Sequence, residues 1–110
     1  MSKNFPEIIK NLPLADIPLK GVTAFLSQGE NHQILFMEFE EDVDLSEHQH
    51  ESQYGTVLDG RIELVIDGIK NTYVKGDKYY IPAGVKHCGK IYAGYADITF
   101  FNQRDRYKTK

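Results

Sequence analysis

The chain has 110 residues, a hydrophobic content of 41% and a formal net charge of -3, from 13 Lys and Arg against 16 Asp and Glu. A chain of this length forms one hydrophobic core rather than two, and its 7 Tyr and 6 Phe are too many for a disordered protein. The charge balance offers no excess of cations to a phosphate backbone, and the longest apolar run, residues 34–37, is far shorter than the roughly 20 residues of a membrane helix. We therefore expect neither nucleic acid nor membrane as a partner.

The first 20 residues are expected to form an N-terminal arm. Asn4 is a candidate cap, and Pro6-Glu7 is a typical start for one or two helical turns, with an extended arm as the alternative. Residues 12–20 alternate apolar residues with proline, a pattern that suits the edge of a sheet. The start of the chain is charged and contains proline, unlike a secretory signal, which favours a cytoplasmic location.

Residues 21–103 are expected to form an all-β domain. Glycine and proline recur at intervals that leave segments of about four to eight residues, the length of strands rather than of helices. Ile62, Leu64 and Ile66 share one face of such a strand, since side chains alternate along it. The predicted strands lie near 21–27, 33–40, 43–50, 53–59, 61–67, 70–74, 78–81, 86–92 and 95–101. Nine short strands in one domain indicate a barrel or a sandwich.

Two further features complete the chain. Asp59-Gly60 and Asp67-Gly68 are dipeptides of tight two-residue hairpin turns. Residues 104–110 have no periodicity and many charges, so we expect a solvated tail.

Histidines supply the candidate chemistry. His48 and His50 are two residues apart, so in a strand both rings lie on one face, where they can share an ion about 2.1 Å from each nitrogen. Such a pair alone is more often an exposed polar stripe than a pair of ligands. His87 alone is compatible with a turn histidine bonded to backbone. His32 lies in a polar segment and is assigned no function.

The spacing around these histidines resembles that of a known family. Residues 76–87 read Gly-x5-Pro-x-Gly-x2-His, which is similar to the second cupin motif, and His48-x-His50-x2-Gln53-x6-Gly60 is similar to the first. The resemblance implies a jelly-roll barrel, also called a double-stranded β-helix, preceded by a short arm or helix. It also implies a divalent transition metal held by His48, His50 and His87, and a homodimer that exchanges its N-terminal arm.

The fourth ligand departs from the family pattern. Gln53 stands where the family usually has Glu, one residue closer to His50 than usual. Its amide oxygen is neutral, so the ion would keep more positive charge and favour an anionic ligand. Glu51 is the alternative, but it is out of phase with His48 and His50 in a regular strand.

We therefore expect a metal-binding protein that acts on or binds a small anionic or hydroxylated molecule. The expected metal is one of Fe, Mn, Ni, Zn or Co, and the sequence leaves its identity open; imidazole-rich sites suit Fe, Ni, Cu and Zn. The resemblance makes dioxygenase, isomerase and decarboxylase chemistry conceivable, while no residue is identified as catalytic. The alternatives are a non-catalytic binding or sensing barrel, with or without metal, and a barrel that has lost its metal.

Overall fold

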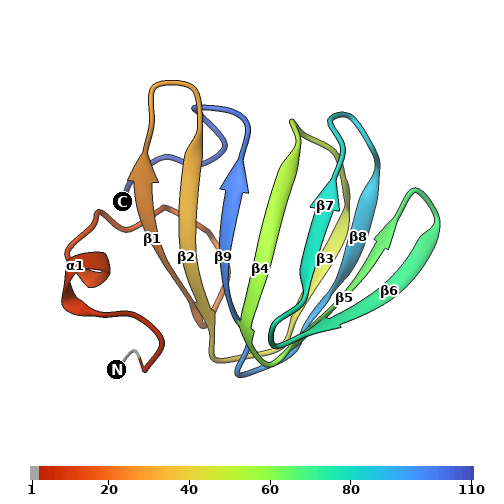
Figure 1. The fold of residues 1–110 in the computed structure, drawn as a ribbon, viewed down its shortest axis with the longest axis horizontal. Coiled ribbons are helices and arrows are strands. Elements are labelled where there is room, and N and C mark those ends of the chain that lie inside the picture. Colours follow the sequence, from red (N-terminus) through yellow and green to blue (C-terminus); the bar gives the residue numbers. More distant parts are fainter. Residues whose placement is uncertain (1–2) are drawn as a thin grey trace.

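Nine strands and one short helix make up the computed structural model, which describes residues 3–110 (Figure 1). All nine predicted strands are present, with ends that differ by at most two residues. No helix in this range is long and apolar enough to cross a membrane. In chain order the elements are α1 (Glu7–Lys10), β1 (Val22–Gln28), β2 (Gln33–Phe39), β3 (Val43–His48), β4 (Gln53–Asp59), β5 (Arg61–Ile66), β6 (Ile69–Val74), β7 (Lys78–Ile81), β8 (His87–Ile91) and β9 (Ala96–Phe101).

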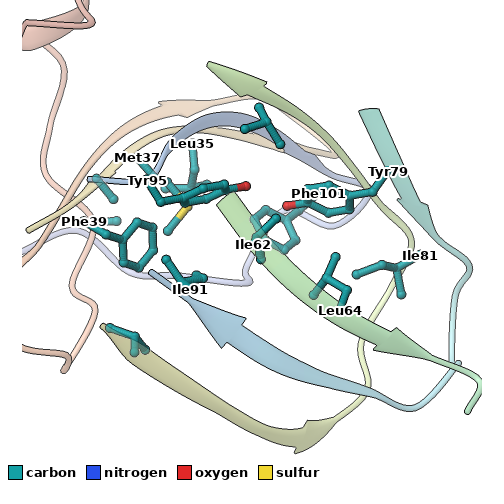
Figure 2. Close-up of a cluster of buried hydrophobic side chains, with 14 of the residues drawn as sticks. Leu35, Met37, Phe39, Ile62, Leu64, Tyr79, Ile81, Ile91, Tyr95 and Phe101 are labelled. Atoms are coloured by element: carbon teal, nitrogen blue, oxygen red, sulfur yellow. The ribbon is translucent and has the colours of Figure 1, made fainter. Parts of the chain in front are cut away.

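The strands form two antiparallel sheets that enclose the core. One has five strands in the order β1-β2-β9-β4-β7, and the other has four in the order β3-β8-β5-β6. Burial alternates along β2, where Gln33, Leu35, Met37 and Phe39 face inward. Figure 2 shows side chains from both sheets meeting between them. This arrangement is the predicted all-β jelly roll.

Strand β9 contributes polar groups to this interior. It lies between β2 and β4, so its inward positions point to the middle of the barrel. Asp97, Thr99 and Phe101 occupy these positions and are buried. Two of the three are polar, which is unusual for the centre of a small core and calls for hydrogen-bond partners.

The N-terminal arm lies on the edge of the five-stranded sheet. The N-cap position of its helix is occupied by Pro6, so the prediction that Asn4 caps the helix is wrong. The side-chain amide of Asn4 donates instead to Glu38 at 2.8 Å. Leu14 then pairs with Phe25 of β1. The arm thus covers an edge within its own chain, and its exchange between two subunits remains a prediction.

The C-terminal segment is anchored to the barrel, although most of residues 104–110 are exposed as expected. Tyr107 exchanges hydrogen bonds with the buried Gln33 side chain, which donates to the Tyr107 carbonyl and accepts from its amide. Thr109 pairs with Ala15 of the arm. Figure 1 accordingly shows the C-terminus next to β1. The prediction of a free solvated tail is therefore only partly correct, because the buried Gln33 side chain needs the backbone groups of Tyr107 as hydrogen-bond partners.

Candidate metal centre

Three histidines lie together at one end of the barrel. One ring nitrogen from each of His48, His50 and His87 lies within 4.8 Å of the others. His48 ends β3 and pairs in register with His87, the first residue of β8. The strand predicted over 43–50 stops at His48, after a register shift that follows Leu45, so His50 comes from the loop. The two motifs, 37 residues apart, therefore meet across one pair of strands.

Backbone hydrogen bonds fix the tautomer of all three rings. The Nδ1 atoms of His48, His50 and His87 lie 2.7, 2.6 and 2.9 Å from the carbonyl oxygens of Ser46, Glu51 and Val85 respectively. A carbonyl only accepts, so each Nδ1 carries the proton and each Nε2 carries a lone pair. Such bonds are typical of metal-binding histidines, because they orient the ring and raise its basicity.

The spacing of the rings fits a shared cation. Nε2 of His50 lies 3.1 Å from Nε2 of His87, and with both Nδ1 atoms protonated neither Nε2 has a proton to donate to the other. Two nitrogens at 90° on an ion about 2.1 Å away are about 3.0 Å apart, and opposite ones about 4.2 Å. The ring nitrogens of the cluster lie within 4.8 Å of one another, so small movements of the rings would bring them to these separations. Three histidines in this arrangement could hold a metal ion.

The surroundings favour the neutral form of two of these imidazoles, those of His50 and His87. The pKa of His50 is lowered to about 4, mainly by burial, with a smaller contribution from Arg106, while the hydrogen bond to the Glu51 carbonyl opposes the shift. Burial also lowers the pKa of His87. Neutral rings are the form that binds metal, so the lowered pKa values of His50 and His87 favour cation binding by these two rings at a pH below the ordinary pKa of histidine.

Gln53 and Glu51, the two candidates for a fourth ligand, have different positions. Gln53 begins β4, shares its inward face with Gly55 and Val57, and lines the same cavity as the histidines. Glu51 is exposed and is not among the lining residues. Of the two, Gln53 is the one that lines the cavity, and its part as fourth ligand stays a prediction.

A buried carboxylate was missed by the sequence analysis. Asp97 is 2% exposed and lines the cavity; its Oδ2 accepts hydrogen bonds from Tyr95 at 2.6 Å and Tyr79 at 3.3 Å. Its Oδ1 is buried and has no protein partner. Burial raises the pKa of Asp97 to about 6, although hydrogen bonds from Tyr95, Thr99 and Tyr79 oppose that shift. Alternation along β9 would have put Asp97 inside, but an isolated aspartate in an apolar strand gives no sign of its role.

Arg106 is the second residue that was missed, because it lies in the segment expected to be solvated. It lines the cavity, and its guanidinium carbon is 4.5 Å from the centre of the Tyr107 ring. Its Nε is buried without a hydrogen-bond partner. The hydrogen bonds between Tyr107 and Gln33 anchor the neighbouring residue of the chain, and Arg106 lines the same cavity as the histidines.

These residues surround a cavity of about 370 Å³ that both sheets line. The apolar part of its wall includes Met37, Ile62, Leu64 and Phe101, and residues 17–19 of the arm cover one side. A volume of this size accepts a small molecule and lies at the lower end of the range for ligand pockets. Its polar groups are the three histidines, Gln53, Asp97 and Arg106, together with a few hydroxyl groups and Asp44.

Comparisons with known proteins agree with this architecture. A family model described as "Cupin domain" matches residues 35–93. KdgF from Halomonas sp. has a TM-score of 0.69 at 21% identity, over 83% of this chain and 87% of that one. An RmlC-like cupin from Shewanella frigidimarina has a TM-score of 0.74 at 21% identity, over 88% and 87%. No curated protein matches in sequence.

Oxalate decarboxylase of Bacillus subtilis is also similar. One variant of it has a TM-score of 0.72 at 18% identity, and the match covers 87% of this chain but only 28% of the decarboxylase. Another structure of that enzyme concerns its Mn(II) centres. At such identities the likeness to solved structures establishes the fold.

Proposed function

Because the chain belongs to the cupin family, we propose that it binds a divalent transition metal through His48, His50, His87 and Gln53 and holds a small anionic or hydroxylated molecule beside it. The observation that carries the proposal is the set of three imidazoles whose Nδ1 protons are all committed to backbone carbonyls, with the ring nitrogens within 4.8 Å of one another. When bound, such an ion acts as a Lewis acid toward an oxygen of the ligand.

The charges of the cavity favour an anion. Three neutral imidazoles and an amide would leave the full charge of the ion unbalanced. Arg106 adds a second positive group with an unused buried N–H. Asp97 is the opposing charge, but hydroxyl groups already bond to one of its oxygens. A carboxylate of the ligand is thus attracted by the ion and by Arg106, while the free oxygen of Asp97 suits a hydroxyl group.

Metal and anion binding can be tested separately. Protein purified without chelator and reconstituted with Fe, Mn, Ni, Zn or Co should retain one equivalent of at least one of them. Calorimetric titration of the loaded protein with acetate, oxalate and glycerate should give heat, and glycerol should give less. Arg106→Leu should weaken carboxylate binding, by about tenfold for a lost charged contact of roughly 1.4 kcal/mol, without loss of metal.

Arg104→Leu is the matched control, because Arg104 is exposed and does not line the cavity. Carboxylate affinity in this variant should equal that of the wild type. Absence of metal after reconstitution with all five ions would refute the proposal. Equal loss of carboxylate affinity in both arginine variants would refute the role of Arg106.

A charge change at position 53 tests the fourth ligand. Gln53→Glu replaces the amide oxygen by a carboxylate, so the affinity for Co²⁺ should rise by on the order of tenfold through the added ion pair. Competition with a chromophoric chelator measures this affinity. Ser52→Glu introduces the same charge one residue earlier, on the opposite phase of the chain, and should have a much smaller effect. Weaker binding in Gln53→Glu would place Gln53 outside the coordination sphere.

A further inference from the structure

We infer that Tyr79, held by Asp97, is a positioning residue that turns the amide of Gln53 so that its oxygen faces the metal site. The inference rests on the proposed metal site. It identifies Tyr79 and Asp97 as the residues that orient Gln53 so that it can serve as a ligand there. An amide has a donor end and an acceptor end, and only the oxygen binds a cation. A glutamine ligand therefore needs a neighbour that fixes its orientation, whereas a glutamate has two equivalent oxygens.

The direction of the hydrogen bonds follows from Asp97. Its carboxylate is an acceptor only, and the hydroxyl of Tyr79 lies 3.3 Å from its Oδ2, so Tyr79 donates its one proton to Asp97. The Tyr79 oxygen is then an acceptor for other groups. Nε2 of Gln53 lies 3.2 Å from that oxygen and donates to it. The NH₂ end of the amide is thus bound to Tyr79, and Oε1 is left for the cavity.

The protonation states support this direction. Burial raises the pKa of Tyr79 well above its ordinary value, so the hydroxyl keeps its proton at neutral pH. Asp97, with its pKa raised to about 6, is ionised above that pH. Tyr95 binds the same carboxylate oxygen from the other side at 2.6 Å. Figure 2 shows the hydroxyl groups of Tyr79 and Tyr95 pointing toward each other inside the core.

Gly55 makes room for this arrangement. It lies opposite Tyr79 in the register of β4 and β7. A Cβ at position 55 would come within 2.3 Å of the Tyr79 ring, so only glycine allows the ring to lie across β4. The ring passes over position 55, and its hydroxyl reaches Gln53, two residues away on the same face. A glycine in the middle of a strand thus has a specific packing reason.

A double-mutant cycle tests the inference. Tyr79→Phe removes the hydroxyl and keeps the ring, and it should weaken Co²⁺ binding by about 10- to 100-fold, as is usual when a group that orients a ligand is lost. In a Gln53→Ala background the same change should have no effect on affinity, because no amide remains to be oriented. The visible absorption spectrum of bound Co²⁺ should change with Tyr79→Phe and should already be changed in Gln53→Ala.

Tyr73→Phe is the matched control. Tyr73 packs against Tyr79, with ring centroids 5.6 Å apart, but it does not line the cavity. Loss of its hydroxyl should leave Co²⁺ affinity unchanged, and thermal melts check that every variant is folded. Unchanged affinity in Tyr79→Phe, or an equal loss with and without Gln53, would overturn the inference. Failure of the wild type to bind any of the five metals would instead refute the metal site itself, and the inference with it.

Discussion

His50→Ala is expected to abolish stoichiometric metal binding. The ring contributes one of three converging nitrogens, and its Nε2 lies 3.1 Å from that of His87. Removal of a ligand should cost more than the roughly 10- to 100-fold that loss of a group orienting a ligand costs. His50 lies in the loop after β3 and is only partly buried, so the fold should tolerate the change. Competition with a chelator gives the affinity, and metal analysis after gel filtration gives the stoichiometry.

His32→Ala provides the control for the loss of a histidine as such. His32 stacks on the exposed ring of Phe100 and does not line the cavity. Metal content in this variant should equal that of the wild type. If His50→Ala retained wild-type affinity while His32→Ala lost it, the histidine cluster would not be the binding site.

Asp97 should give the metal-free protein an unusual dependence of stability on pH. Burial raises its pKa in the folded state to about 6 from an ordinary value of 3.8. Below pH 4 the group is protonated in both states. Between about pH 4 and 6 the unfolded chain releases the proton first, so stability is lost as the pH rises. A shift of this size corresponds to about 3 kcal/mol at most, which urea unfolding in the presence of a chelator can detect.

Asp97→Asn isolates this contribution. The variant cannot ionise at position 97. Between pH 4 and 6 it should therefore lose less stability than the wild type, by up to about 3 kcal/mol. His50 and His87 act in the opposite direction, since their lowered pKa values destabilise the fold as the pH falls below 6.5. They are present in both proteins, so the difference between the two curves belongs to Asp97. Parallel curves would show that Asp97 has an ordinary pKa.

The local pattern of the chain was enough for the strands and for the histidine cluster. Turn dipeptides such as Asp67-Gly68 separate short alternating segments, and the observed strand ends differ from the predicted ones by at most two residues. Two spaced motifs indicated His48, His50 and His87, and these side chains do lie together. Phase alone also favoured Gln53 over Glu51, because an alternating strand leaves little freedom in where a side chain points.

What the sequence could not provide is the set of groups whose position depends on long-range packing. Arg106 reaches the cavity because Tyr107 is bound to Gln33, 74 residues earlier in the chain. Asp97 accepts hydrogen bonds from the nearby Tyr95 and from Tyr79, which lies on a different strand, β7.

The sequence by itself thus determined the all-β architecture and the histidine cluster, since both follow from residue spacing within short segments. The tertiary structure alone decided which of the remaining polar residues share the cavity and which hydrogen-bond donors and acceptors they face. Those pairings depend on the register between strands that are distant in the chain, and no local pattern encodes it.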